Sequence, residues 1–189
     1  MPASARGFLA FAPEALKAAG ISLRLALPED VPVLTEIYAS TREEELRQVP
    51  WSAEQKKAFT DWQSARQEEH YALHYPNAER LLIRRLPSAA VEGEGQAAIG
   101  RIYVETTRLE VRLMDITLLR ACRSLGIGTR LMNELLRFAD ALQRPVTLHV
   151  EPFNPAKRMY ERMGFEVSET RGLYEFMIRA TPDVGQGVS

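Results

Sequence analysis

Two glycines, Gly126 and Gly128, stand where a strand-like apolar run gives way to an amphipathic helix. The run covers residues 111–119, and a short polar link of residues 120–124 separates it from the glycines. The first backbone N–H groups of an α-helix have no intrahelical partner, and the helix dipole is positive there. Glycine lets a backbone approach a ligand without interference from Cβ. This stretch therefore predicts a site for a phosphate-bearing ligand.

A second segment with chemical potential runs from Asn154 to Phe165 and contains Tyr160. It opens with Asn-Pro, which is typical of a helix start, and Gly164 is typical of a helix end. A tyrosine hydroxyl, with an ordinary pKa of about 10, can donate a proton to a leaving group. Considered alone, however, Tyr160 would more simply pack its ring against a neighbouring strand.

Three acids lie close enough in the expected topology to accept a proton: Glu105, Asp115 and Glu151. Asp115 stands inside an apolar strand, where a carboxylate is unusual and costly unless it is partnered. The alternative interpretation makes Asp115 a structural anchor, bound to backbone or to an arginine. The sequence does not show which residues of this strand point to which face of the sheet. The face that Asp115 occupies therefore stays open.

Composition indicates a globular protein. The chain has 189 residues with a net charge of −1, 46% hydrophobic and 26% charged residues. The length suits one domain, and the charge does not favour a nucleic-acid or membrane-surface partner. The one cysteine, Cys122, excludes an intrachain disulfide, and no apolar run is long enough to span a bilayer. We therefore expect a cytoplasmic protein with no nucleic-acid or membrane partner.

The elements that must position these residues follow from periodicity and turn signals. We expect an extension over residues 1–20, one domain over 21–179 and a disordered tail over 180–189. Within the domain the predicted order is β-α-α-β-β-β-α-β-α-β-β, with a mobile hairpin loop at 87–96. Ser52 and Gln55 form a capping-box signature for a long helix to about His74, with Phe59, Trp62 and Leu73 on its apolar face.

Both glycine-containing segments resemble motifs of one family. Residues 123–128, Arg-Ser-Leu-Gly-Ile-Gly, match the (Arg/Gln)-x-x-Gly-x-(Gly/Ala) signature of the GCN5-related N-acetyltransferases (GNAT). Residues 154–165 are similar to the family's N-x-x-(A)-x-x-x-Y-x-x-x-G-F helix. Either motif alone is weak, but both in order, each after a strand, are specific. The resemblance covers roughly residues 21–179, and similar T-R-E-E-E-L…P-W stretches (here residues 41–51) occur in bacterial members of unassigned substrate.

The resemblance implies a mixed α/β fold (α+β in character): a mostly antiparallel sheet of about seven strands with a splayed parallel pair, flanked by about four helices. It implies acetyl-CoA as cofactor, held in the splay. The implied cofactor-binding residues are Ile116, Thr117, Leu118, Leu119, Arg123, Ser124, Leu125, Gly126, Ile127, Gly128, Thr129, Asn154, Ala156, Lys157 and Tyr160. It also places Tyr160 near the thioester sulfur as general acid, and leaves Asp115 or Glu151 as the base.

The expected activity is transfer of an acetyl group to a primary amine, by direct attack in a ternary complex. The acceptor, a small molecule or a peptide, should meet the helices after the first strand. Arg42, Glu44, Glu45 and Trp51 are the candidate acceptor-binding residues, because acids attract a cationic amine and tryptophan can stack on it. A solvated helix start explains the same acids equally well. The fold also makes a homodimer through the last strands plausible.

Other functions fit the sequence less well. A non-catalytic acyl-CoA-binding or regulatory module on the same fold is the main alternative, and Tyr160 argues against it. A nucleotide-binding loop would need the Gly-Lys-Ser/Thr of a P-loop, which residues 123–129 lack. Cys122 has no adjacent histidine to activate it as a nucleophile. His70 and His74 are spaced for a shared metal but have no third ligand motif nearby, so no metal is expected.

Overall fold

The computed structural model describes residues 7–86 and 97–182. The predicted loop at 87–96 and most of the predicted tail at 180–189 lie outside the described residues. The helices are α1 (Phe8–Phe11), α2 (Pro13–Ala18), α3 (Val31–Arg47), α4 (Ala53–His74), α5 (Ile127–Ala141) and α6 (Lys157–Arg162), with 3-10 turns η2 (Pro28–Asp30) and η3 (Arg120–Cys122). The strands are β1 (Ile21–Leu25), β2 (Glu79–Arg85), β3 (Ala98–Thr106), β4 (Val111–Leu118), β5 (Val146–Val150), β6 (Glu166–Arg171) and β7 (Tyr174–Arg179).

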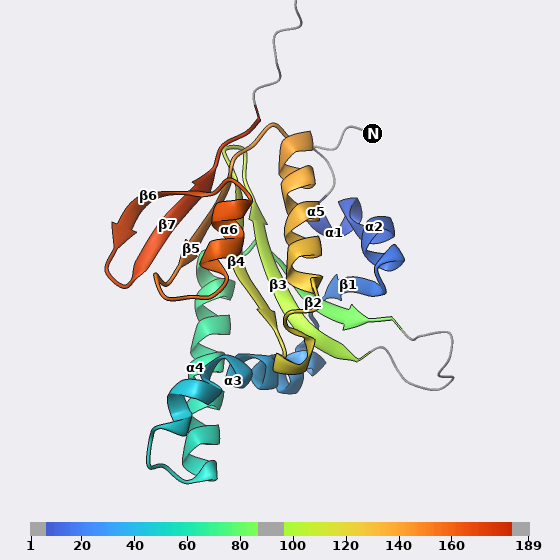
Figure 1. Ribbon diagram of the computed structural model, residues 1–189. Helices are drawn as coiled ribbons and strands as arrows, with labels where there is room; N and C mark the ends of the chain where they lie inside the picture. Colours follow the sequence, from blue (N-terminus) through green and yellow to red (C-terminus); the bar gives the residue numbers. More distant parts are fainter. Residues whose placement is uncertain (1–6, 87–96, 183–189) are drawn as a thin grey trace, which may run out of the picture.

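The seven strands form one sheet in the order β1-β2-β3-β4-β5-β7-β6, as Figure 1 shows. Every neighbouring pair is antiparallel except β4 and β5, which are parallel and joined through α5. A parallel pair needs a long crossover, and the helix that follows Gly126 supplies it. The predicted fold class, with its order of elements from Ile21 onward, is confirmed.

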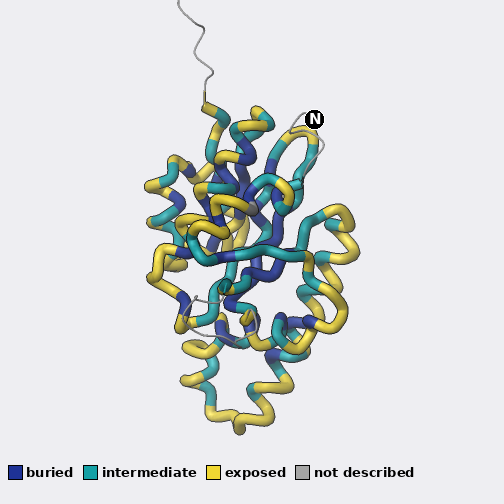
Figure 2. Tube along the Cα trace, turned by 90° about the vertical axis from the view of Figure 1, so that its right-hand side faces the viewer, coloured by how far each residue is buried: buried dark blue, intermediate teal, exposed yellow. Residues whose placement is uncertain are grey.

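Helices cover the two faces of the sheet unequally (Figure 1). One face carries α1, α2, α5 and α6, and most buried apolar residues lie between these helices and the strands. The α5 residues Leu131, Leu135 and Phe138 are fully buried there, as their spacing predicts. The other face carries α3 and α4 over a much smaller apolar cluster of Leu34, Ile37 and Leu82. Figure 2 shows the buried residues concentrated along the central strands, while the far end of the α3–α4 pair is exposed.

The segment before β1 packs on the domain. The ring of Phe8 is fully buried and lies 5.8 Å from the ring of Phe138 in α5. The Glu79 carboxylate of β2 accepts hydrogen bonds from the backbone N–H groups of Phe8 (2.6 Å) and Leu9 (3.0 Å). These bonds satisfy two of the N–H groups that a helix start leaves unpaired.

The long helix α4 begins as predicted, but its predicted apolar face is wrong. Ser52 and Gln55 form the reciprocal capping box. Trp62 and Leu73, however, are 59% and 73% exposed, whereas the buried residues of α4 are Thr60 and Ser64. The helix turns a polar face inward because the sheet beneath it carries a buried arginine, described below.

Two further details differ from the expectation or extend it. Helix α6 begins at Lys157, two residues later than Asn-Pro predicted, although the Asn154 side chain does accept a hydrogen bond from the Ala156 N–H (2.9 Å). Strand β6 is an edge strand whose residues are all exposed. Dimerisation through the last strands stays a prediction.

Candidate active site

Strands β4 and β5 separate part-way along their length. Their parallel pairing covers only Val111–Leu113 and Val146–Leu148, whereas β4 continues to Leu118 and β5 to Val150. The remainder of β4 is still paired with β3 on its other side. Its edge toward β5 therefore offers backbone N–H and C=O groups to a ligand in the gap. This is the splay in which the sequence resemblance places the pantetheine arm beside Ile116 to Leu119.

A bulge at Met114 sets the direction of the side chains on β4. Val104 pairs with Leu113 and Tyr103 with Asp115, so Met114 is an extra residue on β4. Before the bulge, Val111 and Leu113 face the large core. An extra residue reverses the alternation, so that Ile116 and Leu118 face that core while Asp115 and Thr117 face α3 and α4.

The turn after β4 is built to present N–H groups at the start of α5. Gly126 has φ +76° and Ser124 has φ +60°, both in the left-handed region, and α5 begins at the next residue, Ile127. A Cβ on Gly126 would meet no other atom within 4 Å, so glycine is needed there for its backbone conformation. The residues present therefore fit a pyrophosphate at the N-terminus of a 15-residue helix.

The side chain of Arg123 fastens this turn to the domain. Its Nε donates a hydrogen bond to the Leu118 carbonyl (2.8 Å), and its Nη2 donates to the carbonyl oxygen (3.3 Å) and the Oγ (3.4 Å) of Ser40 in α3. Arg123 thus joins the end of β4 to α3 through its side chain. Its backbone N–H donates to the Arg120 carbonyl (3.2 Å), so the predicted contact of Arg123 with a pyrophosphate stays a prediction.

The opposite wall of the splay comes from the loop after β5 and from α6. Asn154 and Ala156 lie in this loop, and their hydrogen bond holds its shape. Lys157 Nζ forms an ion pair with Glu175 of β7 (2.6 Å). This pairing directs Lys157 toward β7, and its predicted contact with the cofactor stays a prediction.

Tyr160 projects from α6 into the interior and is only 5% exposed. Its ring lies 5.8 Å from the ring of Phe165. Burial, and to a lesser degree the negative charge of Asp115, raise the pKa of Tyr160 to about 12. Among the described residues, its hydroxyl has no hydrogen-bond partner, so the proton it carries at neutral pH is available to a ligand.

A polar cavity of about 720 Å³ opens on the α3–α4 face of the splay. Its strand wall includes Met114, Asp115 and Thr117 of β4, and Val150 and Glu151 at the end of β5. Its other walls come from α3, α4 and neighbouring strands: Tyr38, Thr41, Arg42, Arg66, Gln67, His70, Tyr71, Tyr75, Arg101, Arg112, Leu113, His149, Asn154 and Tyr174. Asp115, Glu151 and Arg42, which the sequence singled out, thus line one cavity.

Asp115 is held by the buried Arg101, a residue that the sequence reasoning missed. Arg101 is 1% exposed, and its Nη2 lies 2.5 Å from an Asp115 carboxylate oxygen. The other Asp115 oxygen accepts a hydrogen bond from Thr117 Oγ1 (2.8 Å). From α4, Glu68 pairs with the Arg101 Nη1 (3.1 Å), and Gln67 accepts a hydrogen bond from Nη2 (2.5 Å). The available signal was an arginine inside an otherwise apolar strand.

The other two acids differ from Asp115 in their surroundings. Glu151 is exposed and has no ion-pair partner in the described part of the chain. Glu105 lies opposite Arg112 in the register of β3 and β4, and it does not line the polar cavity. Glu151 is therefore the cavity carboxylate whose oxygens are open to water. The choice of base between Asp115 and Glu151 stays a prediction.

The remaining acceptor candidates lie outside the polar cavity. Glu44 pairs with Arg47, and Glu45 with Arg42, as exposed helix pairs at 3.0 Å. Trp51 is 41% exposed and packs edge-on against Phe59, with ring centroids 5.2 Å apart. Binding of the acceptor by these three residues stays a prediction.

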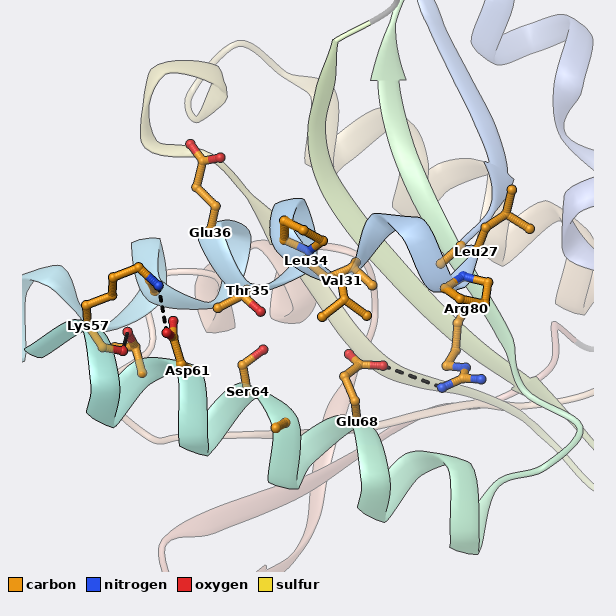
Figure 3. Close-up of a pocket in the computed structure, with 16 residues that line it drawn as sticks. Leu27, Val31, Leu34, Thr35, Glu36, Lys57, Asp61, Ser64, Glu68 and Arg80 are labelled. Carbon is orange, nitrogen blue, oxygen red and sulfur yellow. Dashed lines mark hydrogen bonds and ion pairs between the residues drawn. The ribbon is translucent and has the colours of Figure 1, made fainter.

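A second cavity, of about 950 Å³, lies between α3 and α4 on the side of β1 and β2. Figure 3 shows its residues, with Leu27 and Val31 on one side and Ser64 and Glu68 on α4. The Glu68 carboxylate separates it from the polar cavity, because one oxygen faces Arg80 (3.5 Å) and the other binds Arg101. This cavity is larger, but no residue of the splayed strands β4 and β5 lines it.

The described residues contain no group of three or more His, Cys, Asp or Glu side chains arranged to hold a metal ion. Across residues 7–86 and 97–182, no helix is both long and apolar enough to cross a membrane.

Comparison with known proteins agrees with this geometry. The model of the acetyltransferase (GNAT) family matches residues 34–165. The chain therefore belongs to this family of acetyltransferases, and acetyl-CoA is the acetyl donor. The enzyme class and the cofactor expected from the sequence are thereby confirmed. No curated protein sequence matches the chain.

Solved structures share the fold at low identity. The PaiA N-acetyltransferase of Thermoplasma acidophilum, in complex with coenzyme A, has 17% identity and a TM-score of 0.60, covering 85% of this chain and 98% of that one. Spermidine N-acetyltransferase of Vibrio cholerae, in complex with CoA and spermine, has 15% identity and a TM-score of 0.54, with coverages of 85% and 95%. Arabidopsis thaliana Naa50, in complex with the bisubstrate analogue CoA-Ac-MVNAL, has 16% identity and a TM-score of 0.52, with coverages of 84% and 97%.

Proposed function

We propose that this protein is an N-acetyltransferase that transfers the acetyl group of acetyl-CoA to a primary amine by direct attack in a ternary complex. The observation that carries the proposal is the position of Tyr160. This residue is buried, its hydroxyl has no hydrogen-bond partner among the described residues, and it lies close enough to Asp115 of the polar cavity for that carboxylate to raise its pKa.

The cofactor-binding residues would act in two groups. Residues 116–119 of β4 and its turn would offer backbone groups along the splay, residues 124–129 would offer N–H groups to the pyrophosphate, and Arg123 would hold the turn in place through its side chain. Asn154 and Ala156 form the facing wall. When bound, acetyl-CoA supplies an acetyl thioester, whose C–S bond breaks as the amine nitrogen attacks the carbonyl carbon.

Tyr160 would stabilise the departing sulfur. Its pKa of about 12 keeps the hydroxyl protonated throughout the neutral range, so it can donate a hydrogen bond to the sulfur as negative charge develops there. A thiol has an ordinary pKa of about 8.5, so complete proton transfer from Tyr160 alone would be uphill. The step balances when the proton that the amine gives to the base is passed on through water to Tyr160, which restores its hydroxyl.

The amine has to lose a proton before or during the attack, since an alkylamine has a pKa of about 10.4. Glu151 is the stronger candidate for this role, because its carboxylate is open to water whereas that of Asp115 is held by Arg101 and Thr117. Asp115, whose charge Arg101 neutralises, would then serve as a structural anchor in the wall of the polar cavity.

The proposal is tested by incubating the protein with acetyl-CoA and a panel of amino acids, amines, polyamines and peptides, with detection of free CoA and of the acetylated product by mass spectrometry. The expected result is CoA and N-acetylated product in equal amounts, with no acetylated protein when the acceptor is omitted. Binding of acetyl-CoA without turnover of any amine would instead identify a non-catalytic binding module.

A further inference from the structure

The charges that line the polar cavity are divided between its walls. The strand wall carries two carboxylates: Asp115, which is paired with Arg101, and Glu151, which has no ion-pair partner among the described residues. The helix wall carries the guanidinium groups of Arg42 from α3 and Arg66 from α4. The amine of an acceptor has to reach the splay, which the strand wall borders, so any second functional group of the acceptor extends toward the helix wall.

The two further arginines of the cavity are already neutralised. Arg101 is paired with Asp115 and Glu68. Arg112 is paired with Glu110 (2.6 Å) and lies over the Tyr75 ring, 5.9 Å from its centroid. Neither arginine therefore adds a free positive charge to the cavity, and the available cations are those of Arg42 and Arg66.

Arg42 and Arg66 are held by partners that a ligand can replace. Their carboxylate partners, Glu45 (3.0 Å) and Glu69 (2.9 Å), are 69% and 70% exposed and do not line the cavity. Exposed ion pairs of this kind contribute little to stability, because water screens them. The Arg42 guanidinium is also oriented by Tyr38, whose hydroxyl accepts from Nε (3.4 Å) and whose ring centroid lies 5.7 Å away.

We propose that the acceptor is an amine that also carries an anionic group, a carboxylate or a phosphate, which Arg42 and Arg66 bind on the helix wall. This inference rests on the proposed function and adds the acceptor class to it. Guanidinium groups bind carboxylate and phosphate through paired hydrogen bonds. The tyrosine rings of the cavity, among them Tyr71 and Tyr75, fit an apolar body between the two charged ends.

The same arrangement disfavours polyamines. A second ammonium group on the acceptor would face the guanidinium groups of Arg42 and Arg66, and like charges brought together in a partly desolvated site are costly. An acceptor that is neutral beyond its amine would leave these guanidinium groups paired only with their exposed glutamates. The preference is therefore expected in the order anionic, neutral, cationic.

The test compares acceptors that differ only in the anionic group, with acetyl-CoA as donor. Leucine and phenylalanine are each compared with their α-amides, O-phosphoethanolamine is compared with ethanolamine, and spermidine is the cationic probe. At least one anionic acceptor should exceed its neutral partner tenfold or more in kcat/KM, which reflects one or two charge-assisted hydrogen bonds. The leucine and phenylalanine comparisons test a carboxylate, and the O-phosphoethanolamine comparison tests a phosphate. An α-amide has a less basic amine than its acid, so this preference cannot arise from amine ionisation.

Variants then locate the anionic group. Arg42→Gln and Arg66→Gln should each lower kcat/KM for the preferred anionic acceptor about tenfold and leave its neutral partner and the KM for acetyl-CoA unchanged. Arg137→Gln is the matched control, because Arg137 also pairs with an acid three residues away (Glu134, 3.1 Å) but does not line the cavity; its kinetics should equal those of the wild type.

Two results would overturn the inference while leaving the proposed function intact. One is equal or faster turnover of the neutral amines or of spermidine, and the other is an anionic preference that survives in both arginine variants. Binding of acetyl-CoA without turnover of any amine would overturn the proposed function itself, and the inference with it.

Discussion

Asp30 joins the start of α3 to strand β1, and Asp30→Asn tests how much this joint stabilises the fold. The carboxylate accepts hydrogen bonds from Nη1 (2.5 Å) and Nη2 (2.6 Å) of Arg24 and from the Leu27 N–H (2.7 Å). Asparagine keeps the size of the side chain but loses its charge and one acceptor oxygen. The helix that carries Arg42 would thereby lose its connection to the sheet edge.

The size of the effect follows from the pKa of Asp30, which is lowered from 3.8 to about 2, chiefly by the Arg24 hydrogen bonds. A shift of nearly two units corresponds to about 2 kcal/mol in the free energy of unfolding. Because the pKa is lowered in the folded state, this contribution is fully present above pH 3.8. It is lost as the pH falls toward about 2.

The assay is urea denaturation of the wild type and Asp30→Asn at pH 7 and at pH 3. The variant should be less stable by about 2 kcal/mol at pH 7, and by roughly half of that at pH 3. Glu29→Gln is the control, since the neighbouring Glu29 is exposed and makes no hydrogen bond to Arg24; its stability should stay within about 0.5 kcal/mol of the wild type. A deficit of equal size at both pH values would refute the reasoning.

Three further substitutions test the framework of the site. A Cβ on Gly100 would lie 2.2 Å from the Thr117 carbonyl oxygen, so Gly100→Ala should displace β4. The substitution should lower the free energy of unfolding in urea by about 1–3 kcal/mol and weaken acetyl-CoA binding in calorimetry. An unchanged dissociation constant for acetyl-CoA would contradict this. Gly126→Ala strains a left-handed residue and should cost about 1 kcal/mol, seen as a lower Tm and weaker acetyl-CoA binding; an unchanged Tm would argue against the strain. Arg101→Leu removes the ion-pair partner of Asp115 and the closer of the two ion-pair partners of Glu68, and should cost about 3–5 kcal/mol in urea denaturation. A stability equal to that of the wild type would show that the buried pairs contribute nothing.

Local signals in the sequence were sufficient to predict most of the fold. The capping box at Ser52 and the glycines at 126 and 164 mark boundaries through backbone preferences that act within a few residues. The apolar spacing of α5 matches a helix that buries one face. Such signals depend on neighbours in the chain, and for that reason the order of elements could be predicted.

Features that depend on partners distant in the chain could not be predicted. The bulge at Met114 reverses the faces of β4, and only the register against β3 shows it. Arg101 is buried because Glu68, 33 residues before it, comes from another element. The polar inner face of α4 has the same cause: Gln67 and Glu68 face the sheet to bind this arginine, so the apolar spacing of α4 indicated the wrong face.

The candidate site likewise has one part that local sequence signals predicted and one part that depends on residues distant in the chain. Two local motifs identified the glycine turn and Tyr160, because the residues that would contact the cofactor are close in sequence. The polar cavity is assembled from α3, α4, β3, β4 and the end of β5. Its charge pattern became visible only when these elements were brought together. The sequence therefore proposed Glu44 and Glu45 as acceptor-binding residues, although they do not line the cavity, and did not single out Arg66.

The most direct test of the account is the rate of acetyl transfer by Tyr160→Phe, measured together with its affinity for acetyl-CoA. The substitution removes one hydroxyl and keeps the ring against Phe165. The account predicts a kcat at least about 100-fold below that of the wild type, with an unchanged dissociation constant for acetyl-CoA in calorimetry. A kcat equal to that of the wild type, with the same affinity, would contradict the role of Tyr160 as the proton donor in this cleft.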